Sequence, residues 1–245
     1  LPKGEHIFKF VSITDKTIFS EQILEVDESP CVVKVNLEQK IAEKRKKIEY
    51  TTSDGHKLHL SHLFWNTNII DHTYCNGKGT ITCREDITEI IESAFFGCRN
   101  LLSITIPNSV NSIGYRAFCD CKALTSIEIP DNVIKVGDEA FAGCTNLSAF
   151  YGKYATADNR CWIVDGELRA FASAGLTTYT IPSSVTKIGN SALYGSKLID
   201  ITIPNTITSI EKGAFEYCNK LTSISIPSSI TKIGGSAFYG CDCIK

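Results

Sequence analysis

Hydrophobic residues recur in a fixed order through the last two thirds of the chain, separated by polar residues at constant positions. The copy that begins at Leu124 reads LTSIEIPDNVIKVGDEAFAGCTN, and similar copies begin at Leu101, Leu198 and Leu221. Their shared pattern is L-x-x-I-x-I-P-x-x-V/I-x-x-I/V-G-x-x-A-F-x-x-C. Self-similarity at a period of about 20 to 50 residues indicates a repeat architecture.

Equivalent leucines define the period of this repeat: Leu101, Leu124, Leu147, Leu176, Leu198 and Leu221. The steps between them are 23, 23, 29, 22 and 23 residues, so one copy contains an insertion. The insertion lies within residues 152–175, where CWIVDGELRAF predicts a hairpin with Asp165 and Gly166 at its turn. We expect the hairpin to project from the repeats or to pack as an irregular coil, with Trp162 buried.

Each copy predicts one coil of chain. In the copy from Leu124, the alternation of Ile127 and Ile129 predicts a short strand with one buried face. Pro130 lacks an amide hydrogen and ends the strand, and Gly137 suits a tight bend. One coil cannot bury its own apolar face, but coils stacked about 4.8 Å apart can. The pattern therefore predicts a solenoid whose strands form one parallel sheet.

The period, the I-P after the strand and the A-F-x-G-C at the turn resemble the BspA-like leucine-rich repeat surface proteins. The resemblance covers about residues 87–245. It implies an α/β-type repeat solenoid, a right-handed coil with a parallel β-sheet on its concave face and an irregular or short-helical convex side. It also implies an extracellular or cell-surface protein of a Bacteroides-type bacterium that acts by binding, with outer-membrane anchoring and a possible lipid anchor on its precursor. The chain contains no Met and starts at Leu1, so we expect a trimmed or mature form.

The part of the chain before the repeats divides into two predicted regions. Residues 1–48 form a small β-rich unit with a charged linker, and we expect its strands at 6–13, 17–26 and 31–37. Residues 49–86 form an N-terminal cap of the solenoid, which continues over 87–245. In the cap we expect a hairpin at Ile48–Leu60, with its turn at Asp54 and Gly55, that acts together with the segment 76–83.

The eleven cysteines raise the alternatives of a disulfide framework, a metal site and core packing. Five of them occupy the same slot of the repeat: Cys98, Cys121, Cys144, Cys218 and Cys241. Five stacked cysteines cannot all be joined in disulfides, because one is left without a partner. The chain also has no C-x-x-C pair of the kind that binds metals. We therefore predict mostly free, buried thiols and no metal site at the cysteines.

Histidines form the one metal-like cluster of the sequence. His56, His59 and His62 have the spacing H-x-x-H-x-x-H, and His72 follows. Neither a strand nor a helix brings the first three to one compact site, so we predict no bound metal. Known enzyme motifs are missing, and the repeats contain no histidine that could act as a base. We therefore predict no catalytic residues, no cofactor and no enzymatic activity.

Composition narrows the classes of partner. A net charge of −2 gives no electrostatic reason for nucleic-acid binding, and no stretch approaches the roughly 18 apolar residues that cross a bilayer. Outward strand positions form a hydroxyl-rich, slightly acidic strip, which we call the strand strip: Ser103, Thr105, Ser126, Glu128, Tyr151, Thr178, Thr180, Asp200, Thr202, Ser223 and Ser225. We predict that this strip binds a protein or glycan macromolecule at a host or bacterial surface. Soluble strand residues without a binding role and a structural spacer that displays another domain remain the alternatives.

Overall fold

The structure is a computed structural model that describes residues 6–11, 18–24, 43–60 and 68–245. The chain forms two compact units, Leu1–Lys40 and Ile41–Lys245. In the first unit, β1 (His6–Val11) pairs antiparallel with β2 (Ile18–Leu24). These are two of the three strands predicted there, and the third, at 31–37, lies outside the described residues.

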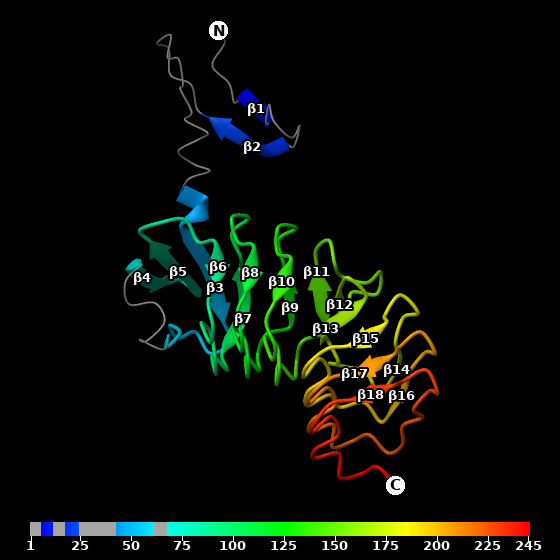
Figure 1. Ribbon diagram of the computed structural model, residues 1–245. Helices are drawn as coiled ribbons and strands as arrows, with labels where there is room; N and C mark the ends of the chain where they lie inside the picture. The colour runs from blue at the N-terminus through cyan, green and yellow to red at the C-terminus, as the bar shows by residue number, and fades with distance from the viewer. Residues whose placement is uncertain (1–5, 12–17, 25–42, 61–67) are drawn as a thin grey trace, which may run out of the picture. The chain divides into compact units, whose positions relative to one another are not determined.

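The strands that carry the strand strip form two separate sheets rather than the one parallel sheet predicted (Figure 1). The sheet before the insertion contains β7 (Leu101–Thr105), β9 (Ser126–Glu128) and β11 (Ala149–Tyr151), which pair in parallel. The sheet after it contains β14 (Thr178–Thr180) and β16 (Asp200–Thr202). The buried middle residues Ile127, Phe150 and Ile201 confirm the predicted alternation.

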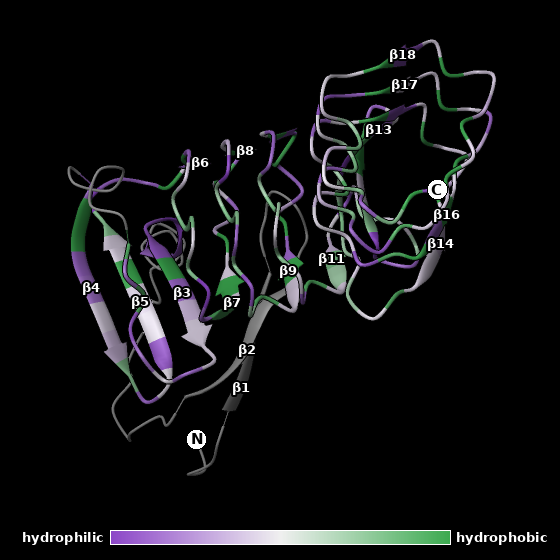
Figure 2. Cartoon of the chain, turned by 90° about the horizontal axis from the view of Figure 1, so that it is seen from below, coloured by the Kyte–Doolittle hydropathy of each residue, from purple (hydrophilic) through white to green (hydrophobic). Residues whose placement is uncertain are grey.

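The opposite side of each coil contains a second set of short parallel strands. Before the insertion these are β6 (Glu89–Ile90), β8 (Ser112–Ile113) and β10 (Lys135–Val136). After it they are β15 (Lys187–Ile188), β17 (Ser209–Ile210) and β18 (Lys232–Ile233). Figure 2 looks into the later coils, with β14 and β16 on one side and β17 and β18 on the other. This side of the repeats therefore consists of turns and two-residue strands. Of the irregular and short-helical forms expected for the convex side, the structure has the irregular one.

The insertion is a hairpin built into the sheet of β15, β17 and β18 rather than one that projects from the coils. β12 (Cys161–Val164) and β13 (Glu167–Phe171) pair antiparallel, and β13 pairs in parallel with β15. Asp165 and Gly166 lie at the turn, both with positive φ, as the sequence predicts. Trp162 is fully buried, which confirms that expectation, and its ring packs 6.3 Å from Phe150 between centroids.

The N-terminal end of the solenoid is covered by an antiparallel sheet of three strands. They are β3 (Lys47–Thr52), β5 (Lys78–Cys83) and β4 (Ile69–Cys75), and β3 also pairs antiparallel with β7. Most of the segment 76–83, assigned to the cap in the sequence analysis, forms β5 of this sheet. The hairpin predicted at Ile48–Leu60 is wrong, because β3 uses both of its edges to pair with β5 and β7.

Buried phenylalanines stack from coil to coil in the core. Phe95, Phe118 and Phe141 have nearly parallel rings, with successive centroids 5.2 Å and 5.4 Å apart. Phe215 and Phe238 repeat the arrangement at 5.3 Å. The insertion separates these two stacks, and the buried residues fall into two clusters at the same place.

Where a copy has a glycine after its second Val or Ile, that glycine is required for a reason other than the tight bend predicted. A Cβ atom on Gly137 would lie 2.6 Å from the backbone of Gly114 in the preceding coil, and one on Gly234 would lie 2.4 Å from the backbone of Lys212. Neither glycine has a positive φ. At these two positions side chains are excluded because neighbouring coils approach closely, which is a constraint on stacking.

We predict that Gly137→Ala lowers the free energy of unfolding by about 2 kcal/mol, because backbone atoms in the adjacent coil cannot move aside for the methyl group. Urea denaturation followed by circular dichroism measures the change. Gly235→Ala is the matched control, since a Cβ there would meet no atom within 4 Å. It should change the stability by no more than about 1 kcal/mol, and an equal loss in both variants would contradict the stacking constraint.

Candidate functional site

The strand strip is exposed, but it is divided in two by the insertion. The pairing of β7, β9 and β11 places Thr105, Glu128 and Tyr151 side by side in one row. Ser103 and Ser126 lie two residues earlier on the first two of these strands. All five side chains are exposed except Ser126, which is half-buried.

The second half of the strand strip lies on the coils after the insertion. Here Thr178 pairs with Asp200, Thr180 pairs with Thr202, and all four residues are exposed. Ser223 and Ser225 are also exposed, although their segment forms no strand. Because β11 and β14 belong to different sheets, Glu128 and Tyr151 do not form one row with Asp200.

The cap adds two residues to the first half of the strip that the sequence prediction did not include. Glu49 lies opposite Thr105 and Thr51 lies opposite Ser103 on β3. The Thr51 and Ser103 hydroxyl oxygens are 2.6 Å apart, within hydrogen-bonding distance. The alternation of Ile48 and Tyr50 with polar residues indicated a half-buried strand, but nothing in the repeat pattern indicated that its partner was β7. The row Glu49–Thr105–Glu128–Tyr151 is therefore acidic and ends in an aromatic side chain.

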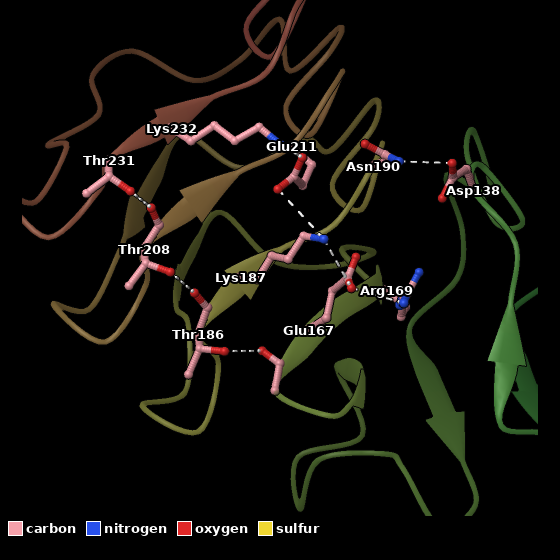
Figure 3. A network of polar contacts seen from close by, with 11 residues as sticks. Asp138, Glu167, Arg169, Thr186, Lys187, Asn190, Thr208, Glu211, Thr231 and Lys232 are labelled. Carbon is pink, nitrogen blue, oxygen red and sulfur yellow. Dashed lines mark hydrogen bonds and ion pairs between the residues drawn. The ribbon is translucent and has the colours of Figure 1, made fainter.

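The opposite side of the later coils carries a ladder of ion pairs, shown in Figure 3. Lys187 lies between two carboxylates, with Nζ 3.4 Å from Glu167 and 3.7 Å from Glu211. Lys232 contacts Glu211 at 2.8 Å, and this hydrogen bond is the main reason that the pKa of Glu211 is lowered. Since each charge has an opposite partner, this ladder supports coil stacking and leaves little free charge for a ligand.

A shallow cleft lies between the last coil before the insertion and the first coil after it. It is lined by residues 139–142, 169–171, Ser191, Ala192 and Tyr194. Its charged residues are already paired, Glu139 with Arg116 at 2.6 Å and Arg169 with Glu167 at 3.0 Å. At its edge the Asn190 amide donates a hydrogen bond of 2.9 Å to Asp138, which joins the two stacks (Figure 3). The hydrogen bond between Asn190 and Asp138 therefore links the two stacks. The cleft itself offers no unpaired charged side chain to a ligand.

A chain of hydrogen bonds fixes the insertion to β14. The Tyr179 hydroxyl donates to Asp158 at 2.9 Å and lies 3.3 Å from the Cys161 sulfur. Burial raises the pKa of Cys161 to about 12, although the hydrogen bond with Tyr179 lowers it in part. Burial also raises the pKa of Tyr179 strongly. Burial would raise the pKa of Asp158, but hydrogen bonds from neighbours including Thr156 hold it below its ordinary value. Because Cys161 is fully buried and stays protonated at neutral pH, the chain is structural rather than nucleophilic.

Four cysteines of the repeat slot are buried in the core as predicted, Cys241 in the last coil is half-buried, and the described cysteines are free thiols. The structure adds a reason for the residue type. The Cys144 thiol donates to the Phe118 carbonyl at 3.0 Å, and the Cys218 thiol donates to Leu193 at 3.2 Å. Each thiol thus links its coil to the preceding one. Burial raises the pKa of Cys98 to about 11 and that of Cys218 to about 12, so these thiols remain protonated.

The described histidines do not gather at one site. His56 and His59 are exposed, His62 lies outside the described residues, and His72 is half-buried in the cap. His72 Nε2 is 2.7 Å from the Tyr50 hydroxyl, and burial lowers the pKa of His72 to about 4. Within residues 43–60 and 68–245, no group of three or more potential ligands could hold a metal ion.

Comparison with known proteins agrees with the architecture. The stacked coils with a 23-residue repeat define a leucine-rich repeat protein. The family described as BspA type leucine rich repeat region matches in six copies, over residues 62–156 and 167–245. The chain belongs to this family. Among curated proteins, none matches the sequence.

Solved structures similar to this chain come from several bacteria. A leucine rich cell surface protein from Faecalibacterium prausnitzii is 28% identical, with a TM-score of 0.49 over 65% of this chain and 50% of that one. The Treponema pallidum leucine rich repeat protein is 27% identical, with a TM-score of 0.45 over 66% of this chain and 73% of that one. The chain thus spans about half the length of the Faecalibacterium protein. Among the described helices, none is long and apolar enough to cross a membrane.

We predict that Tyr179→Phe lowers the free energy of unfolding by about 1 kcal/mol, because Asp158 loses a donor and the Cys161 thiol loses an acceptor. Thermal or urea denaturation measures the loss. Tyr151→Phe removes the same hydroxyl from an exposed tyrosine on the neighbouring sheet and should leave stability unchanged. Equal stability of Tyr179→Phe and the unmodified protein would show that the hydrogen-bond chain contributes nothing.

Alkylation of the native protein tests the cysteine assignment. Among the described cysteines, Cys75 and Cys243 are exposed and should react rapidly with iodoacetamide at neutral pH. The buried Cys121, Cys144 and Cys218 should react only after unfolding, because they are inaccessible and their pKa values are raised by burial. Peptide mass spectrometry after a short labelling pulse identifies the modified residues. Rapid labelling of Cys144 in folded protein would rule out its packed position.

Proposed function

We propose that this protein is a non-enzymatic binding module that contacts a protein at a host or bacterial surface through the first half of the strand strip, extended by Glu49. The observation that carries the proposal is the row Glu49–Thr105–Glu128–Tyr151, which is exposed on a sheet whose other face is fully packed. A rigid sheet presents such side chains at fixed spacing, so little conformational entropy is lost on binding.

The composition of this row supports a basic protein as the partner. Glu49 and Glu128 are the two carboxylates, and no described ion pair neutralises either of them. Tyr151 is 46% exposed and supplies the aromatic contact that is enriched at binding hot spots. The second half of the strip contains one carboxylate, Asp200, among hydroxyl residues. It therefore attracts a basic partner less strongly than the first half does.

Membership of the BspA type family supports an extracellular or cell-surface location for this binding, with an anchor on the outer membrane as part of the same proposal. A spacer role remains the second candidate, because the chain contains a separate compact unit, Leu1–Lys40, that the solenoid could display. The two roles differ in one respect that can be measured. A spacer is indifferent to the residues of the strip, whereas a binding module depends on them.

The experiment measures attachment of fluorescently labelled full-length protein to fixed epithelial cells and to fixed bacterial cells by flow cytometry. The variant Glu49→Ala with Glu128→Ala and Tyr151→Ala should bind at least about tenfold more weakly, the loss expected of a hot-spot cluster. The variant Thr178→Ala with Asp200→Ala and Thr202→Ala should bind nearly as well as the unmodified protein.

The matched control changes three exposed or half-exposed residues outside the strip, Glu92, Tyr115 and Asp242, to Ala. It removes the same number of carboxylates and one tyrosine, so it should retain binding. Attachment that survives the first variant would contradict the assignment of the strip. Unmodified protein that attaches to neither cell surface would contradict the binding proposal itself.

A further inference from the structure

A tyrosine side chain in the N-terminal cap joins two strands that are not neighbours. In the sheet order β3–β5–β4, Tyr50 on β3 lies opposite Gly79 on β5. A Cβ atom on Gly79 would lie 1.9 Å from the Tyr50 ring, so the glycine leaves room for the ring to pass over β5. Beyond β5, the Tyr50 hydroxyl reaches Nε2 of His72 on β4 at 2.7 Å. A side-chain hydrogen bond therefore holds the cap in addition to its strand pairing.

The donors around the Tyr50 oxygen favour an unprotonated Nε2 on His72. The Leu58 amide donates to this oxygen at 3.3 Å. The hydroxyl hydrogen is donated to Nε2 of His72, the one acceptor bonded to it in the described part of the chain. An imidazolium ring is a donor at both nitrogens. Protonation would therefore put a second N–H against the Tyr50 oxygen and leave the hydroxyl hydrogen without an acceptor.

The surroundings of His72 also disfavour its protonation. The Lys57 ammonium, from the segment between β3 and β4, donates to the His72 carbonyl oxygen. Asp71 on β4 acts in the opposite direction, and the β5 residues on the same face, Gly79 and Ile81, are uncharged. Burial is the largest influence and Lys57 the second, and together they lower the pKa of His72 to about 4.

β4 has the weakest hold on the core among the six strands of its sheet. It is the last strand of the sheet, and none of its residues is fully buried. Each of the other five strands has at least one buried residue. A second hydrogen bond, of 2.7 Å, joins the Tyr74 hydroxyl on β4 to the Thr52 hydroxyl on β3. Because segments with few buried apolar contacts open at low free energy, β4 depends on these two side-chain bonds.

We propose that Tyr50 and His72 form an acid-sensitive lock, in which protonation of His72 breaks the bond to Tyr50 and releases β4 from the sheet. At neutral pH the lock is closed and β4 covers the edge of β5. In acid, the release of β4 leaves the backbone amides and carbonyls of β5 as an open sheet edge that can pair with another strand. This lock does not depend on the binding proposed for the strand strip.

The direction of the pH effect follows from the two states of His72. In the released strand its pKa returns to about 6.5, whereas in the closed cap it is about 4. Between these values the open state binds more protons than the closed state. The closed state is therefore fully favoured above about pH 6.5 and loses this advantage as the pH falls to about 4. The opening equilibrium constant should rise roughly 50-fold from pH 7 to pH 4.5.

Histidine NMR and amide hydrogen exchange on the full chain test the lock. The chain has five histidines, and the ring signal of His72 is the one that disappears in His72→Gln. This signal should titrate with a midpoint at a pH of about 4, the pKa of His72 in the closed cap. Exchange of the β4 amides, corrected for the intrinsic effect of pH, should accelerate roughly 50-fold from pH 7 to pH 4.5. The amides of β9 in the coils should stay protected.

Three variants make the result specific to His72. His72→Gln cannot titrate but can still accept the Tyr50 hydrogen, so its β4 exchange should change less than about threefold with pH. Tyr50→Phe removes the bond and should accelerate β4 exchange already at pH 7. His59→Gln is the matched control, because it removes an exposed histidine from the same cap and should keep the full response.

Titration of His72 near its ordinary value of about 6.5 would overturn the proposal, because the ring would then be free of the lock. Equal acceleration of β4 exchange in the unmodified protein and in His72→Gln would overturn it too, since the response would not come from this histidine. Acceleration of β9 to the same extent as β4 would mean that the whole unit unfolds in acid, and it would also contradict a local release of β4.

Discussion

Close stacking of one coil on the next is the constraint on which the rest of the structure depends. Backbone amides of one coil donate to carbonyls of its neighbour, as from Phe95 to Ala117 and from Phe118 to Ala140, both at 2.8 Å. The glycine slot keeps side chains out of this contact, and a cysteine thiol adds a further bond between coils. Because every coil must match its neighbours, core positions vary less along the chain than outward positions do.

The insertion shows how the fold accommodates a break in that constraint. β13 pairs with β15 and so joins the sheet of β15, β17 and β18, which continues the stacking on one side of the coil. On the other side β11 and β14 belong to different sheets, and the strand strip is interrupted. The Asn190–Asp138 hydrogen bond and the Tyr179–Asp158 hydrogen bond hold the two stacks and the inserted segment together. The break therefore limits any continuous row of strand residues to one side of the insertion.

The repeat predicts the coil, its buried positions and the core cysteines, because these follow from periodicity alone. It also predicts which strand residues face outward. It cannot predict that β3 joins β7, since this pairing links residues about fifty positions apart and has no periodic signal. For the same reason Glu49 was missed as a member of the acidic row. The glycine at Gly137 was predicted correctly as a constrained position, but the cause lies in the neighbouring coil and not in its own turn.

Departures from the repeat are the most informative residues, and the structure compensates two of them internally. Glu211 occupies the glycine slot and is paired with Lys187 and Lys232. Tyr179 replaces a core isoleucine, and its hydroxyl is satisfied by Asp158. Tyr217 replaces a left-handed glycine, and its ring packs between Tyr194 and Tyr239 and beside Gly240. The left-handed backbone at Tyr217 therefore carries a cost that a glycine there would avoid.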